Sequence, residues 1–310
     1  MPPLAVSAAL SVVPDAQGVA VPSPIRASWL VIAFGFVVAL LTLAASGIGI
    51  AVMSVGPLAF LAATLVGVQF HYTRNRPDAR IAATCGILAM LIAACLLAAI
   101  ISHTSLRFGS PHIDSALSAA DLALGIRAPA IVLAFADYPA FAALLSVIYS
   151  SAMPVCIVLG LALAVLGREA KAWEFGFCFT FCLVLAAIVS IGFPALGSTV
   201  YHGIEGVAGL PSDAGNFHMA TVDYYRNDPA AIFDLAKVQG IVTFPSFHMV
   251  MALLVPYALR GTGLPGWIAM VWAVLVTISS VVIGGHYVVD LLGGAMTWAA
   301  SAWWIGRASR

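Results

Sequence analysis

The sequence predicts an all-α integral membrane protein with about eight transmembrane helices. Hydrophobic residues make up 62% of the 310-residue chain and charged residues 8%, whereas an ordinary soluble domain is about 25% charged. The mean hydropathy is +1.06. Apolar runs of roughly 20 residues, the length that crosses a bilayer as a helix, recur along the chain. Composition, hydropathy and run length therefore all predict a multi-pass membrane protein.

Eight runs are candidate spans. The sixth is short, but its first turn can lie inside the protein rather than in lipid. Only Ser46 and Gly47 separate the first run from the second. The runs cover residues 27–46, 48–70, 81–102, 139–166, 174–194, 246–260, 264–284 and 286–306. Residues 1–25 contain no Lys or Arg and so lack the basic region of a secretory signal, and we expect a disordered tail there.

The basic residues predict the orientation of the spans. With a cytoplasmic amino terminus, nine of the 13 basic residues lie in short segments on the cytoplasmic side, as the positive-inside rule requires. These nine are Arg26, Arg74, Arg76, Arg80, Arg168, Lys171, Arg260, Arg307 and Arg310. The segments 103–138 and 195–243 then form outer loops. A net charge of zero, with no basic run, gives no indication of nucleic-acid binding.

The outer loops are too polar to span. In the first, Ile113, Leu117, Ala120 and Leu124 recur at helical spacing, with Asp114 and Asp121 elsewhere around the helix. This pattern indicates an amphipathic helix in the membrane interface, or equally a cap packed on the bundle. The second loop is long enough to be functional or disordered. The five cysteines lie within apolar runs without metal-ligand spacing, so we expect them to pack in the core.

The residues best suited to chemistry are His286, Asp290 and His248. His286 and Asp290 are four residues apart, so they share one helix face and the carboxylate can orient the imidazole. His248 precedes a pair of antiparallel spans that returns the chain to the same membrane face. Ionisable groups at membrane spans are costly and usually functional, although a structural hydrogen-bonded pair is the alternative.

A predicted anion site lies beside them. Pro245 suits the first turn of a helix, and the residues after it have backbone N–H groups free to bind phosphate, with the Ser246 hydroxyl as a further donor. This set suits nucleophilic phosphoryl transfer. His286 would attack phosphorus, Asp290 would fix its tautomer, and His248 would exchange protons with the leaving and entering oxygens. The chemistry requires no metal and no cofactor.

Two sequence motifs resemble those of a known family. Pro245-Ser246-Phe247-His248 and Gly284-Gly285-His286-Tyr287-Val288-Val289-Asp290 resemble the second and third motifs of the type 2 phosphatidic acid phosphatase (PAP2) superfamily. The runs 240–248, 114–125 and 193–197 look like its Aur1-type inositolphosphotransferase-like branch. The resemblance implies a six-helix core with an extracytoplasmic active site and the same three roles. We therefore expect two accessory spans at 26–80 and a catalytic membrane domain at 81–310.

The chain departs from the superfamily in its cations. Ser279 and Ser280 align with the Ser-Arg that begins the third motif, and the Lys and Arg-Pro of the first motif have no counterpart. We expect Arg226 and Lys237 to bind the substrate phosphate instead, with a structural role in the loop as the alternative. Tyr287 is a further candidate for substrate contact.

The resulting hypothesis is a membrane-embedded lipid phosphotransferase of the inositolphosphotransferase type, working through a phosphohistidine. A PAP2-type lipid phosphate or pyrophosphate phosphatase is the alternative, and a non-enzymatic transporter with a His–Asp proton relay is a more distant one. The expected partners are a lipid-linked phosphate, membrane lipids and a polar alcohol or water as acceptor. The expected location is the plasma (inner) membrane, with the site on its extracytoplasmic face.

Overall fold

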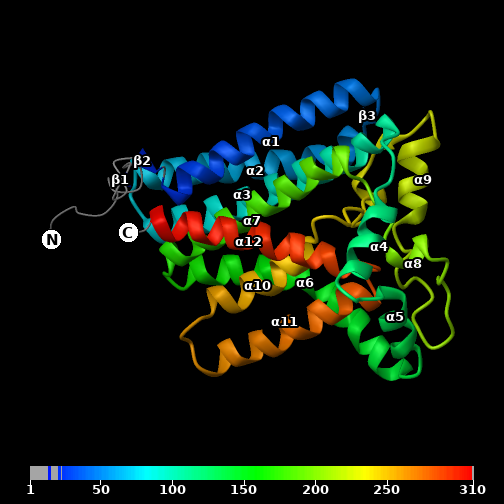
Figure 1. The fold of residues 1–310 in the computed structure, drawn as a ribbon. Helices are drawn as coiled ribbons and strands as arrows, with labels where there is room; N and C mark the ends of the chain where they lie inside the picture. The colour runs from blue at the N-terminus through cyan, green and yellow to red at the C-terminus, as the bar shows by residue number, and fades with distance from the viewer. Residues whose placement is uncertain (1–12, 15–19, 22, 309–310) are drawn as a thin grey trace.

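The computed structural model describes residues 13–14, 20–21 and 23–308, and the described residues are almost entirely helical (Figure 1). The tail expected at 1–25 lies largely outside them. The elements in chain order are β1 (Val13–Pro14), β2 (Ala20–Val21), α1 (Pro24–Ser46), β3 (Gly49–Ile50), α2 (Val52–Arg74), α3 (Ala79–Ser105), η2 (Leu106–Phe108), α4 (Asp114–Ala123), α5 (Ala128–Ala136), α6 (Pro139–Val165), α7 (Glu169–Gly192), α8 (Ser198–Tyr201), α9 (Met219–Asn227), β4 (Ile232–Phe233), η3 (Leu235–Lys237), α10 (Phe247–Ala258), α11 (Leu264–Val282) and α12 (Val288–Ala308).

Each of the eight predicted runs overlaps a helix, but not every one of these helices is long and apolar enough to cross a membrane alone. Among the described residues, six helices meet both conditions, and these are α1, α2, α3 with its η2 extension, α6, α7 and α11. The helices α4 and α5 are bent by 85° at a short break and could count as a seventh span. Helix α10 is shorter than a span because Ser246 caps its start and it ends at Ala258. The protein is thus a multi-pass membrane protein, while the number eight stays a prediction.

Helix α3 lies at the centre of one half of the bundle, packed on α1, α2, α6 and α7. Its side chains Ile87 and Met90 are fully buried with Phe175 and Phe179 of α7. The accessory helices α1 and α2 pack against α3, and large apolar side chains such as Phe34 and Phe60 are exposed on their outer sides. An exposed apolar surface of this kind suits contact with lipid chains.

The short turn between α1 and α2 is joined to the second outer loop. Strand β3 pairs in parallel with β4, and the Ala51 N–H donates to the Phe233 carbonyl at 2.9 Å. The Ser54 hydroxyl accepts a hydrogen bond from Leu235 N at 2.9 Å. The hairpin that α1 and α2 form therefore holds one end of the loop 195–243.

Helix α4 caps the bundle, but the apolar residues expected on one of its faces are not buried together. Asp114, Leu117 and Asp121 are buried, whereas Leu122 and Leu124 are about half exposed and Ala120 is exposed. The two carboxylates turn inward to accept backbone hydrogen bonds, and this leaves Ala120 and Leu124 of the expected apolar face at the surface. The helices α4, α5, α8 and α9 gather at one end of the bundle, opposite the α10–α11 turn and the end of α12 (Figure 1).

Candidate functional site

The segment between α11 and α12 positions His286. Gly285 adopts a φ of +72°, a left-handed conformation that favours glycine, and the chain turns there towards α12. His286 Nδ1 then lies 3.3 Å from Asp290 Oδ2, and the same oxygen accepts from Tyr287 N at 2.8 Å. His286 is 3% exposed and Asp290 0%. Since a carboxylate can only accept, Nδ1 carries the proton and Nε2 presents its lone pair.

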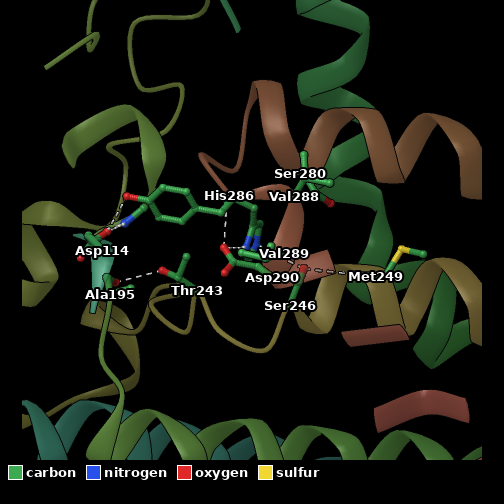
Figure 2. A network of polar contacts seen from close by, with 12 residues as sticks. Asp114, Ala195, Thr243, Ser246, Met249, Ser280, His286, Val288, Val289 and Asp290 are labelled. Carbon is green, nitrogen blue, oxygen red and sulfur yellow. Dashed lines mark hydrogen bonds and ion pairs between the residues drawn. The ribbon is translucent and has the colours of Figure 1, made fainter. Parts of the chain in front are cut away.

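Helix α10 approaches α12 closely at this point. A Cβ on Gly294 would overlap the Ser246 carbonyl oxygen, and Ser246 N donates to the Asp290 carbonyl at 3.0 Å. The Ser246 hydroxyl accepts from Met249 N at 3.4 Å as the N-cap of α10, and it lies 3.4 Å from His286 Nε2 (Figure 2). The expectation that Pro245 occupies the first turn was wrong, because the cap at Ser246 starts the helix after it.

The second histidine lies beside the first. The rings of His248 and His286 are 6.1 Å apart between centroids. Tyr149 of α6 stacks on His248 with a centroid distance of 3.9 Å and an interplanar angle of 15°. Sequence reasoning missed Tyr149, because nothing in an apolar run distinguishes a tyrosine that stacks on a motif histidine from one that packs in the core.

The two rings line a cavity of about 840 Å³. The helices α3, α6, α7 and α10 form its walls, with apolar residues such as Ala98, Met153 and Leu183. The outer loops add polar residues, among them Asp213, His218 and Gln239. Among the described residues that line this cavity there is no Lys or Arg. The cavity thus joins an apolar interior to a polar, histidine-rich end.

The structure does not bring the two expected cations to this cavity. Arg226 bonds His112 Nε2 at 2.9 Å and the Ser110 carbonyl at 3.2 Å. The Lys237 ammonium lies 3.5 Å from the centroid of the Tyr224 ring. Both side chains therefore hold parts of the outer loops together, which matches the structural alternative.

Tyr287 faces away from the cavity and is fully buried. Its hydroxyl donates to Asp114 Oδ1 at 3.1 Å. Burial, together with the negative charge of Asp114, raises the pKa of Tyr287 above its ordinary value, so the hydroxyl keeps its proton. Tyr287 thus ties the segment that carries His286 to α4.

Asp114 and Asp121 organise the loops around the site. Asp121 of α4 accepts from the N–H groups of Val288 and Val289 at 3.0 and 2.8 Å, and so caps the start of α12. Asp114 accepts from Leu196 N and Gly197 N, both at 2.9 Å. Their spacing on one helix was visible in the sequence, but their backbone partners belong to distant segments.

Long apolar helices, a His–Asp pair at one end and a second histidine facing it from another helix define a multi-pass membrane protein with a histidine-based site. A family model described as the PAP2 superfamily matches residues 115–304. The chain belongs to this superfamily, and its function is of the phosphatase or phosphotransferase type. No curated protein and no solved structure matches the chain.

Proposed function

We propose that the protein is a membrane-embedded lipid phosphotransferase that works through a phosphohistidine at His286. The observation that carries the proposal is the fixed set at the cavity wall: Asp290 bonded to Nδ1, Nε2 left as the nucleophile, and His248 within reach. A nucleophile oriented by a third group and faced by an acid is the arrangement that covalent catalysis requires.

In the first half-reaction, His286 Nε2 attacks phosphorus and the bond from phosphorus to the leaving oxygen breaks. His248 donates its proton to that oxygen, and Asp290 stabilises the imidazolium character at His286. In the second half, the acceptor hydroxyl attacks phosphorus, its proton passes to His248, and the phosphorus–nitrogen bond breaks. Each residue returns to its starting state, and no step uses a metal or a cofactor.

The cavity supports a lipid-linked phosphate as substrate. Its apolar walls lie within the bundle, where an acyl or isoprenoid chain can be buried at a gain of about 25 cal/mol for each Å² removed from water. Phe247 and His248, the first two residues of α10, line the polar end. The N–H groups of a first helical turn lack intrahelical partners and favour anions, so this end suits the phosphate.

The acceptor decides between transfer and hydrolysis. The resemblance of 240–248 and 114–125 to the inositolphosphotransferase-like branch favours a polyol such as inositol, and Asp213 and Gln239 can accept hydrogen bonds from its hydroxyls at the cavity mouth. A PAP2-type lipid phosphate phosphatase is the alternative. The positive-inside pattern favours a site on the extracytoplasmic face of the plasma (inner) membrane.

The test is lipid analysis with purified protein in detergent. Labelled lipid phosphates are offered with and without inositol to the wild type and to His286→Ala. Inositol-dependent formation of labelled inositol phosphate together with the dephosphorylated lipid, absent with His286→Ala, is the expected result. Release of free phosphate alone selects the phosphatase, and turnover by His286→Ala equal to the wild type rejects the histidine mechanism.

A further inference from the structure

We propose that His218 binds the substrate phosphate through its Nδ1 atom and supplies the positive charge that the cavity otherwise lacks. The inference rests on the proposed function and assigns its phosphate-binding group. The need is electrostatic: a phosphate carries one to two negative charges, and phosphoryl transfer depends on charge stabilisation. No Lys or Arg is present among the described residues of the cavity lining.

His218 meets the cavity from the second outer loop. It lies directly before α9, is 3% exposed, and lines the cavity together with His248 and His286. Its Nε2 is 2.9 Å from the Leu196 carbonyl oxygen. Among the described residues no hydrogen-bond partner is present for its buried Nδ1. A buried nitrogen without a partner is costly, and a ligand in the cavity would provide one.

The ring is held in place before any ligand binds. Asp114 fixes the Leu196 backbone through the Leu196 N–H, at 2.9 Å. The turn that leads to His218 is fixed by Gly215 N, which donates to the Ile283 carbonyl at 2.7 Å. This bond joins the turn before His218 to residues 283–286, the segment that ends in His286. A group held in this way loses little freedom when it binds a ligand.

The protonation of His218 follows from its neighbours. Burial lowers the pKa of His218 and the nearby His286 acts in the same direction, whereas the Leu196 carbonyl and Asp114 act to raise it. In the empty cavity the ring is neutral, with its proton on Nε2 because a carbonyl can only accept. A phosphate monoanion transfers its acidic proton to Nδ1. The resulting imidazolium then donates to a phosphate oxygen and keeps its bond to Leu196.

Two substitutions separate this role from a structural one. In His218→Gln the amide can reach the Nε2 position and keep the bond to Leu196, but no donor stands at Nδ1. In His218→Asn the amide can occupy the Nδ1 position, but the bond to Leu196 is lost. His202→Gln is the matched control, because His202 is exposed and bonds Ser118 outside this cavity.

The experiment measures binding of radiolabelled orthophosphate to the full-length protein in detergent, with thermal unfolding of each variant alongside. We expect the Kd for orthophosphate to rise about ten- to hundredfold in His218→Gln, which remains as stable as the wild type. In His218→Asn we expect lower stability but a Kd within about fivefold of the wild type. His202→Gln should change neither.

Two results would overturn the inference. One is wild-type phosphate affinity in His218→Gln, and the other is an affinity that follows stability across the two variants. If the wild type turns over lipid phosphate under either result, the proposed function stands and only the role of His218 fails. A wild type that neither binds phosphate nor turns over substrate rejects both proposals.

Discussion

At the scale of single residues, the orientation of the His286 imidazole decides the chemistry. Asp290 Oδ2 fixes it by accepting from Nδ1 at 3.3 Å and from Tyr287 N at 2.8 Å. Nε2 is then the nitrogen left to attack. The Asp290 carboxylate therefore selects the tautomer of His286 and stabilises the positive charge that develops on its ring.

The first prediction concerns Asp290→Asn. The amide keeps the shape of the side chain, and its oxygen can still accept from Tyr287 N and from Nδ1, but it has no negative charge to stabilise the imidazolium that forms at His286. We expect kcat to fall by about two to four orders of magnitude in steady-state assays of lipid phosphate turnover. The thermal unfolding midpoint serves as the control for folding. A folded variant with a kcat within threefold of the wild type would contradict the charge-stabilising role of Asp290.

The second prediction concerns His248 as the acid. We expect His248→Gln to lower kcat about a hundredfold or more for a substrate whose leaving group is an alcohol, because that oxygen needs a proton as it departs. With a nitrophenyl phosphate, whose leaving group is stable without a proton, the loss should be less than about tenfold. Equal losses with both substrates would show that His248 acts in some other way, such as binding.

At the scale of elements, the close approach of α10 and α12 brings the motifs together. Gly293 and Gly294 stand where α12 passes Phe244 and Ser246, and they leave room for the backbones to meet. Ser246 N then bonds the Asp290 carbonyl. The two motif segments are thus coupled through main chain as well as through His286.

The third prediction tests this contact. The methyl group of Gly294→Ala would overlap the Ser246 carbonyl oxygen, so α10 must move and carry His248 with it. We expect a loss of about 1–3 kcal/mol in the free energy of unfolding and at least a tenfold fall in kcat. Gly306→Ala, in the same helix with nothing within 4 Å of the new methyl group, is the control and should change neither. Similar kcat values for the two variants would refute the coupling.

The same elements show how far sequence could predict the site. The motif residues His248, His286 and Asp290 were identifiable because charged or polar residues in apolar helices are costly. Arg226 and Lys237 were chosen as the nearby basic residues of the outer loops, yet both hold those loops together. A contact between side chains from distant segments, such as the stacking of Tyr149 on His248, depends on helix packing that spacing along the chain does not reveal.

At the scale of the whole molecule, the hairpin that α1 and α2 form is connected to the second outer loop, 195–243, which lines the cavity. The bond from Ala51 N to the Phe233 carbonyl and the pairing of β3 with β4 form this connection. Phe233 in turn packs against Tyr225 and His103. The predicted accessory spans at 26–80 therefore have a structural relation to the site that their sequence did not indicate.

The fourth prediction breaks this connection without disturbing the helices. Ala51 has a φ of −74°, which proline adopts readily. Ala51→Pro therefore fits the backbone of Ala51, but it removes the N–H and places a ring carbon where the hydrogen stood, so the Phe233 carbonyl must move away. We expect amide hydrogen exchange in residues 232–237 to become at least about fivefold faster, because the loss includes one net hydrogen bond of about 1 kcal/mol. Exchange in α3 should stay unchanged. Ala51→Ser keeps the N–H and should match the wild type, and equal exchange in all three proteins would count against the connection.

The fifth prediction concerns the orientation of the molecule. The outer loops lie at one end of the bundle, opposite the α10–α11 turn, and residues of the second loop line the cavity. The positive-inside rule predicts that this end is extracytoplasmic.

Two cysteine substitutions test this orientation. Ser212→Cys lies in the second outer loop and Ala170→Cys at the other end of the bundle, and both positions are exposed. In intact cells a membrane-impermeant maleimide should label Ser212→Cys and leave Ala170→Cys unlabelled until the cells are permeabilised. The wild type is the control, because Cys156, Cys178 and Cys182 are buried and Cys85 and Cys95 are partly so. The reverse labelling pattern would place the site on the cytoplasmic face, and the substrate lipid would then have to be drawn from the inner leaflet.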